Sequence, residues 1–400
     1  MRPAGVAGAV PPLGVALGFL PKDNKNTFNI VIATAEATPV ETTDRLLRDI
    51  GRLLAIHPQV LNYQSWGGRA GVPDFNGLIQ GTSARSGEHV AEIRVNLRDK
   101  HSRSASSIDI VRELRPRIEA IRSRYPGARV RLVEDPPGPP VRATVLAELH
   151  GDDLTGLRAL ALRVEAEFAR TYDMVDISNS EADAALQWRL VPDREKAALA
   201  GVSAAQIADV LSLTYEGQVV GRAHLASERN PVMVRAHVPR AAQPDPKRLE
   251  GLYVANGDGR QIPIAELVRT APALADRAIS RKDNERVIFI GGELARTVPV
   301  YAVLDLNRRL ERLKPEDGLP LSIGNLGFKP TAPDTIGGYQ LLWDGEMRMT
   351  LDIYRDMLAA LGAAIAAVYL LLVAYYRSFV MPLIAMSAVP LGLIGIFPGH

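Results

Sequence analysis

The segment between Tyr63 and Gly87 combines large aromatic rings with several glycines and an arginine. Large rings give broad, adaptable apolar contact, and a glycine-rich loop can change conformation around a ligand. A plainer alternative is a mobile surface loop with one or two rings packed into the core. The residues of interest in this segment are Tyr63, Trp66, Gly67, Gly68, Arg69 and Phe75.

Motifs of enzyme catalysis are absent from the sequence. It has no P-loop, no dinucleotide fingerprint and no nucleophile elbow. Asp152 and Asp153 are adjacent, but they precede a predicted helix, where carboxylates accept hydrogen bonds from backbone N–H groups. The chain has no cysteine, which excludes disulfides, thiolate ligands and thiol nucleophiles. We therefore predict neither an enzyme nor a cofactor.

Metal ligands are also poorly placed in the sequence. Soft ions such as Cu(I) require Met or Cys ligands, yet residues 21–140 contain no methionine. The 7 histidines are scattered, and no two share a helix face at i, i+4. The sequence predicts no metal site, although a harder ion bound by carboxylates stays open.

Two uncharged stretches at residues 357–376 and 378–399 are separated only by Arg377. Roughly 20 apolar residues span a bilayer as a helix, so the pattern predicts a transmembrane helical hairpin. A cation in a short connection favours the cytoplasmic side, which leaves the preceding soluble region outside the cytoplasm. A net charge of +2 argues against nucleic acid as a partner.

Small residues follow one another at helical spacing in the first apolar stretch. Ala359, Ala363 and Ala367 share one face, and Gly362 and Ala366 share another. This spacing allows close helix packing in lipid, although an alanine-rich span without a partner would look the same. We expect residues 339–356 to continue this helix out of the membrane.

The region ahead of the hairpin alternates strand and helix patterns in a repeated order. Residues 28–33, 60–64, 90–97 and 128–133 are predicted strands, with helices after residue 38 and from Ser107. A polar, glycine-rich loop is expected at residues 67–88. This order predicts a ferredoxin-like, split βαβ arrangement.

The same order starts again after a proline-rich boundary at residues 135–140. An insertion with its own strands and a helix capped by Ser203 and Gln206 interrupts the second copy. The fold class is therefore α+β, with two ferredoxin-like subdomains. Duplication of one unit indicates a cleft between the copies.

Several segments carry a resemblance to a known family. They are residues 196–203 (KAALAGVS) with Ile207 and Val210, residues 258–263 (DGRQIP), and residues 374–384 (AYYRSFVMPLI) with residues 389–395 (VPLGLIG). Together they resemble the second periplasmic loop and following membrane helices of resistance-nodulation-division (RND) efflux transporters, in the acriflavine-resistance branch. The resemblance extends over essentially the whole chain.

The resemblance implies a domain map. Residues 1–20 would be the clipped end of a membrane helix, rather than a signal peptide, and residues 21–140 the first porter subdomain. The second porter subdomain would comprise residues 141–185 and 272–335, interrupted by a docking domain at 186–271. Residues 336–376 would form a lead-in and membrane helix, and residues 378–400 the start or most of the next one.

The family resemblance also implies a function and partners. Such proteins form homotrimers in the Gram-negative inner membrane, join a periplasmic adaptor and an outer-membrane channel, and export small molecules in exchange for protons. Substrate would pass Tyr63, Trp66, Gly67, Gly68, Arg69 and Phe75. The family's paired Asp and Lys that carry protons lie in helices that this chain does not contain, so the chain is interpreted as a fragment that would not pump by itself.

Three other functions are weighed against export of organic compounds. One is heavy-metal cation efflux by the same family. Another, from a different class, is a membrane-anchored extracytoplasmic ligand-binding or sensor protein. The third is an auxiliary of protein translocation or lipid export. The docking-like insertion favours the transporter, because a sensor has no need of an oligomeric funnel.

Overall fold

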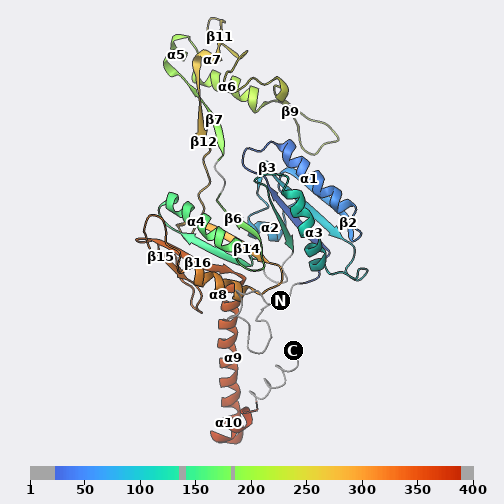
Figure 1. Cartoon of the computed structure of the whole chain (residues 1–400), viewed down its shortest axis with the longest axis vertical. Helices are drawn as coiled ribbons and strands as arrows, with labels where there is room; N and C mark the ends of the chain where they lie inside the picture. The colour runs from blue at the N-terminus through green and yellow to red at the C-terminus, as the bar shows by residue number, and fades with distance from the viewer. Residues whose placement is uncertain (1–22, 135–140, 182–184, 389–400) are drawn as a thin grey trace. The chain divides into compact units, whose positions relative to one another are not determined.

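The computed structural model describes residues 23–134, 141–181 and 185–388 (Figure 1). The chain divides into two compact units. One comprises residues 1–183 and 277–400, and the other is Ala184–Asp276. The predicted clipped helix at residues 1–20 lies outside the described residues.

The first part of the larger unit is a four-stranded antiparallel sheet with the strand order β2-β3-β1-β4. Its elements follow the predicted order, with the short helix α2 in addition. They are β1 (Thr27–Ala33), α1 (Val40–Ala55), β2 (Val60–Arg69), α2 (Phe75–Gln80), β3 (Ser86–Leu97), α3 (Ser107–Arg122) and β4 (Arg129–Glu134).

Helices α1 and α3 cover one face of this sheet. Alternate residues of β1, namely Phe28, Ile30 and Ile32, are buried in the core that these helices form with the sheet. Leu46 and Ile50 of α1 pack into the same core, as their helical spacing predicts. The opposite face of the sheet carries polar side chains, because successive residues of a strand point to opposite faces.

A second sheet in the same unit has the strand order β13-β14-β5-β16-β15, and β6 also pairs with β14. Helices α4 and α8 share a buried core with it. The elements are β5 (Val145–His150), α4 (Leu154–Ala169), β6 (Met174–Asn179), β13 (Arg281–Lys282), β14 (Glu285–Leu294), α8 (Pro299–Leu310), β15 (Leu321–Gly324) and β16 (Tyr339–Gly345).

The start of α4 agrees with the predicted role of its aspartates. Asp153 is the N-cap and its side chain accepts hydrogen bonds from the backbone N–H groups of Thr155 and Gly156. The carboxylate therefore satisfies backbone donors that the first helical turn leaves free.

The prediction that residues 339–356 form one helix is wrong for its first half. Residues Tyr339–Gly345 form β16, which lies between β5 and β15 in the second sheet. Tyr339, Leu341 and Trp343 alternate along the strand and are all buried against the helices. A buried central strand has too few polar residues to show the alternation that separates strand from helix. The second sheet therefore includes residues beyond 335.

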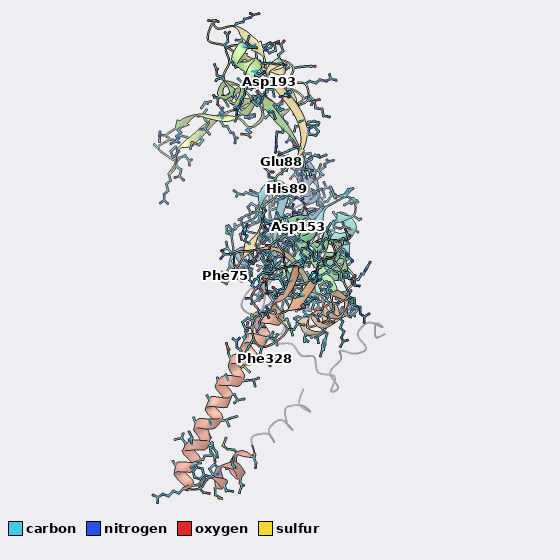
Figure 2. All side chains as sticks on the ribbon, turned by 90° about the vertical axis from the view of Figure 1, so that its left-hand side faces the viewer. Phe75, Glu88, His89, Asp153, Asp193 and Phe328 are labelled. Atoms are coloured by element: carbon cyan, nitrogen blue, oxygen red, sulfur yellow. The ribbon has the colours of Figure 1, made fainter. Side chains whose placement is uncertain are left out.

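Helix α9 (Glu346–Tyr376) begins directly after β16. Gly345 makes the junction with φ 76°, a conformation that favours glycine. In the first turn, the buried Arg348 donates hydrogen bonds to the carbonyl oxygens of Gly327 at 2.6 Å and Phe328 at 3.2 Å, and it pairs with Asp352. Figure 2 shows Phe328 beside the upper end of the helix.

Gly345→Ala is expected to lower the free energy of unfolding by about 1–3 kcal/mol. A Cβ atom at Gly345 would lie 2.4 Å from the carbonyl oxygen of Ala143, and the positive φ adds strain. Thermal unfolding followed by circular dichroism measures the loss. Gly257→Ala is the matched control, because a Cβ there meets nothing within 4 Å. Equal melting temperatures for the two variants would contradict the prediction.

By length and composition, α9 is the one helix in the described part of the chain that could cross a membrane. It contains the predicted stretch at residues 357–376 and ends at Arg377, which adopts a left-handed conformation with φ 49°. The second half of the predicted hairpin begins as α10 (Val380–Met386), and its remainder from residue 389 lies outside the described residues. Ala359, Gly362, Ala363, Ala366 and Ala367 are exposed on α9, and their role in helix packing stays a prediction.

The smaller unit, Ala184–Asp276, has its own buried core around Ile207, Val254 and Ile264. Ser203 and Gln206 form the predicted capping box of α6. Its elements are β7 (Leu186–Pro192), α5 (Arg194–Leu199), α6 (Ala204–Tyr215), β8 (Gln218–Ala223), β9 (Val232–Ala236), η1 (Arg240–Ala242), β10 (Tyr253–Ala255), β11 (Gln261–Pro263), α7 (Ile264–Leu267) and β12 (Val268–Leu274).

Candidate functional site

The predicted glycine-rich loop at residues 67–88 is largely ordered secondary structure. Strand β2 continues through Trp66, Gly67 and Gly68 to Arg69, α2 begins at Phe75, and β3 starts at Ser86. The backbone hydrogen bonds of the β2–β3 ladder outweigh the weak strand propensity of glycine, and a register shift between Gly67 and Arg69 accommodates Gly68 with φ 82°. The loop prediction is therefore wrong for most of this segment.

The predicted site residues do not gather at one point. Tyr63 lies opposite Val95 in the ladder and packs against the core of the first sheet. Gly67 and Arg69 are exposed on β2. Phe75 is 66% exposed, and Figure 2 shows it at the edge of its unit. Their role in binding stays a prediction.

Trp66 is different, because it belongs to a row of side chains on the polar face of the sheet. The strand register places Trp66 opposite Glu92, Glu92 opposite Val31, and Val31 opposite Arg131. Directly opposed residues of neighbouring strands point to the same face. Trp66 on the edge strand β2 and Arg131 on the opposite edge strand β4 therefore point to the same face of the sheet.

Burial raises the pKa of Glu92 in this row. A hydrogen bond from the backbone N–H of Gly71 to its carboxylate, 3.0 Å long, acts in the opposite direction. The ring of Trp66 lies against Gly71, where an added Cβ would be 2.9 Å from the indole. Because Gly71 has no side chain, there is room beside it for both the Trp66 ring and the Glu92 carboxylate.

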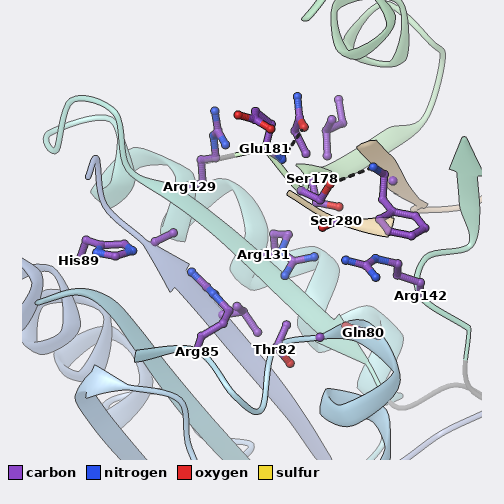
Figure 3. Close-up of a pocket in the computed structure, with 18 of the residues that line it drawn as sticks. Gln80, Thr82, Arg85, His89, Arg129, Arg131, Arg142, Ser178, Glu181 and Ser280 are labelled. Carbon is purple, nitrogen blue, oxygen red and sulfur yellow. Dashed lines mark hydrogen bonds between the residues drawn. The ribbon is translucent and has the colours of Figure 1, made fainter. Parts of the chain in front are cut away.

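A cavity of about 330 Å³ lies at the Val31 and Arg131 end of the row. One wall comes from the first sheet and the segment before β3, and the other from β6 and β14 of the second sheet. None of the predicted site residues lines it. The side chains that give the cavity its character are Arg85, Arg131, Arg142, Phe289, Ser178 and Ser280 (Figure 3).

The cavity is rich in guanidinium groups. Burial, together with a smaller contribution from the positive charge of Arg131, lowers the pKa of Arg85 to about 10. Burial also lowers the pKa of Arg131 and of Arg142, and Arg131 again contributes by repulsion at Arg142. Like charges held together away from water disfavour their charged forms. Arg85 nevertheless remains protonated at neutral pH, since an arginine with a pKa near 10 is still charged. Arginine side chains in proteins generally keep their charge, so the wall formed by the three residues is cationic.

These arginines were not among the residues predicted from the sequence. A signal was available in β4, where Arg129 and Arg131 alternate with Val130 and Leu132, so both arginines must share the face away from the core. Arg85 and Arg142 lie outside the strands, where the periodicity of the sequence does not predict the direction of a side chain. Their convergence depends on the packing of the two sheets.

A second polar cluster lies on the same face of the second sheet as Phe289. Lys282 Nζ is 2.6 Å from Glu148 Oε1 and 3.0 Å from Asp344 Oδ2. Hydrogen bonds and the charge of Lys282 oppose the effect of burial and lower the pKa of Glu148 to about 2, while burial and the neighbouring Glu148 raise the pKa of Asp344. The buried His150 has its Nε2 atom 3.8 Å from Glu148 Oε2, which is too long for a hydrogen bond.

Comparisons with known proteins identify relatives over nearly the whole chain. Residues 9–320 match the model of the AcrB/AcrD/AcrF family. Multidrug resistance protein MdtC of Yersinia enterocolitica is 22% identical over 382 residues, which cover 94% of this chain and 33% of that protein. MdtC of Serratia proteamaculans is 23% identical over 333 residues, covering 81% of this chain and 29% of that protein.

A crystal structure of a heavy metal efflux pump has a similar fold. It superposes with a TM-score of 0.74 at 17% identity, and the match covers 98% of this chain and 38% of that chain. The chain thus spans about a third of the length of the relatives that it matches.

Proposed function

Because this chain belongs to the AcrB/AcrD/AcrF family of RND efflux permeases, we propose that it forms the second periplasmic portion of a proton-driven exporter of organic compounds. The observation that carries the proposal is the family match at residues 9–320, which covers the first sheet, the inserted unit and the second sheet up to β15. The relatives named as multidrug resistance proteins favour organic substrates. Proton transfer would occur in parts of the permease other than the helices described above.

In this proposal the two sheets of the larger unit are the porter subdomains. The first comprises residues 21–140, and the second combines residues 141–185 with residues from 272 to the end of β16. The cavity between the sheets and Trp66 on the same face of the first sheet would contact the substrate. Helix α9 would anchor the porters in the inner membrane of a Gram-negative bacterium, with the porters in the periplasm.

The smaller unit would be the docking domain that joins neighbouring subunits of a homotrimer. Its hairpin of β8 and β9 carries exposed apolar side chains at Val219, Val220, Met233 and Val234. Exposed apolar surface of this kind marks interaction sites. The periplasmic adaptor and outer-membrane channel are further proposed partners, on the basis of the family.

Export of heavy-metal cations is a weaker candidate. The heavy metal efflux pump shares the fold, but a likeness at 17% identity does not extend to the substrate. Among residues 23–134, 141–181 and 185–388, no group of three or more His, Cys, Asp or Glu side chains is placed to hold a metal ion. The cavity wall is cationic, and such a wall repels metal ions.

Trp66→Ala in the complete permease is expected to raise the intracellular level of a fluorescent organic substrate severalfold, because a half-buried aromatic ring on the proposed path is lost. The assay uses cells lacking their own exporters that express the permease with its adaptor and channel. A protonophore should abolish export by the unchanged protein. Leu61→Ala, an exposed position on the same strand, is the control and should have no effect. Export unaffected by the protonophore would contradict the proposal.

A further inference from the structure

Three guanidinium groups line the cavity without a carboxylate partner. Within the part of the chain that the structure describes, Arg85, Arg131 and Arg142 form no salt bridge, and neighbouring carboxylates act on them only through their charge. Figure 3 shows Arg131 between Arg85 and Arg142, with all three directed at the same hollow. Buried charges are ordinarily paired, so this arrangement leaves a positive site without its counter-charge.

The acidic side chains that also line the cavity are already engaged. Glu36 Oε1 lies 3.3 Å from His89 Nε2. Glu181 Oε1 is 2.6 Å from Arg158 Nε and 3.1 Å from Arg277 Nη1. Since these carboxylates have cationic partners of their own, they do not neutralise the three arginines.

The opposite wall of the cavity supplies apolar surface and neutral hydrogen-bonding groups. The guanidinium of Arg142 lies 3.9 Å from the centroid of the Phe289 ring, which leaves its edge N–H groups free to donate. Leu146 and Ile177 lie nearby on the wall, and Ser178 and Ser280 add hydroxyl groups. A volume of about 330 Å³ is near the lower end of the range for small-molecule pockets.

We propose that this cavity binds the anionic group of an amphiphilic organic molecule, a carboxylate or a sulfonate, between Arg85, Arg131 and Arg142, with the apolar part of the ligand against Phe289. The inference rests on the proposed export function and narrows its substrate class to organic anions. Planar guanidinium groups match the oxygen geometry of carboxylates and sulfonates, and charge-assisted hydrogen bonds of this kind are stronger than neutral ones.

Isothermal titration calorimetry on the full chain in a non-ionic detergent tests the proposal with three probes that share one ring system. They are 2-naphthalenesulfonate, the neutral 2-naphthalenesulfonamide and the cationic 2-naphthylmethylammonium. We expect the sulfonate to bind about tenfold or more tightly than the sulfonamide, and the ammonium not to bind, because only the sulfonate neutralises the arginines. The sulfonate affinity should fall as salt increases.

Variants locate the site. Arg131→Gln and Arg142→Gln should each weaken sulfonate binding by about tenfold and leave sulfonamide binding unchanged. Arg48→Gln, on the exposed surface of α1, is the matched control and should have no effect. Without ligand, Arg131→Gln should keep or raise the melting temperature, because it removes like-charge repulsion. A purely structural arginine would instead lower it.

The outcomes separate this inference from the export proposal. The anion site is overturned if the sulfonate and the sulfonamide bind equally well. It is also overturned if neither Arg131→Gln nor Arg142→Gln weakens sulfonate binding. Both results are compatible with a cavity that lies on the export path. Absence of binding for all probes also overturns the anion site. If the unchanged permease exports no fluorescent organic substrate in the cell assay, whatever the charge of that substrate, the result counts against the export function itself.

Discussion

Trp343→Ala is expected to lower the free energy of unfolding by about 3–5 kcal/mol. Trp343 is 0% exposed in the centre of β16, stacks on Phe168 with ring centroids 6.3 Å apart, and donates its indole N–H to Asn307 Oδ1 at 3.0 Å. Alanine would leave a cavity among Phe168 and its neighbours and an amide oxygen without its partner. Thermal unfolding of the full chain, followed by circular dichroism, measures the loss.

Trp343→Phe separates the two contributions. It keeps an aromatic ring against Phe168 but removes the hydrogen bond to Asn307, so we expect a smaller loss of about 1–2 kcal/mol. Trp188→Ala, at a half-exposed position of the smaller unit, is the control and should cost less than either. A Trp343→Ala variant as stable as the unchanged chain would show that β16 is not part of the core.

Lys282→Met is expected to lower the free energy of unfolding at pH 7 by about 2–3 kcal/mol. The lysine is the shared cation of Glu148 and Asp344, and Glu148 is only 3% exposed. Removing the cation leaves two neighbouring carboxylates in a buried site. Because the side chain of Lys282 is itself 40% exposed, we expect less than the loss typical of a fully buried pair.

The pH dependence gives this prediction a second readout. In the unchanged chain the pKa of Glu148 is lowered to about 2, so its contribution to stability is present above its unfolded pKa near 4.5 and is lost as pH falls from there towards 2. The raised pKa of Asp344 has the opposite sign, and ionising it costs stability as pH rises through that folded pKa. The raised pKa of Lys282 adds stability below its unfolded value that is lost only in alkali.

Without the lysine, the carboxylates can relieve their repulsion only by taking up a proton. The loss of stability in Lys282→Met should therefore be greatest at pH 7 and smaller at pH 5. Lys100→Met, at an exposed lysine, should show no such dependence. A constant difference between pH 5 and pH 7 would mean that charge repulsion is not its cause.

The sequence predicted the mixed α+β class, the repeated order of strands and helices and the inserted unit, because their apolar residues follow the periods of strands and helices. It did not predict β16, because Tyr339, Leu341 and Trp343 directly precede a long apolar helix and show no polar alternation that separates them from it. The failure at residues 67–88 has a related cause. Glycines there indicated a loop, whereas pairing of Gly67 and Arg69 with β3 keeps this part of the chain in the ladder.

The candidate site could be predicted only in part. Trp66 was singled out, and the register places it on the same sheet face as the cavity. The arginines of the cavity were missed, because Arg85, Arg131 and Arg142 come from separate segments that only tertiary packing brings together. Charge counts over the whole chain conceal such a local excess, since 47 basic residues are nearly balanced by 45 acidic ones.

Strand β16 has a mechanical consequence. It is hydrogen-bonded on one edge to β5 and on the other to β15, and only Gly345 separates it from the 31-residue helix α9. A strand held on both edges cannot slide without breaking hydrogen bonds on both sides, and the Arg348 contacts to Gly327 and Phe328 resist twisting of the helix relative to the sheet. Strand β16 and helix α9 are therefore rigidly coupled. A displacement of α9 along its axis would be transmitted to the middle of the second sheet, because no flexible linker separates the two elements.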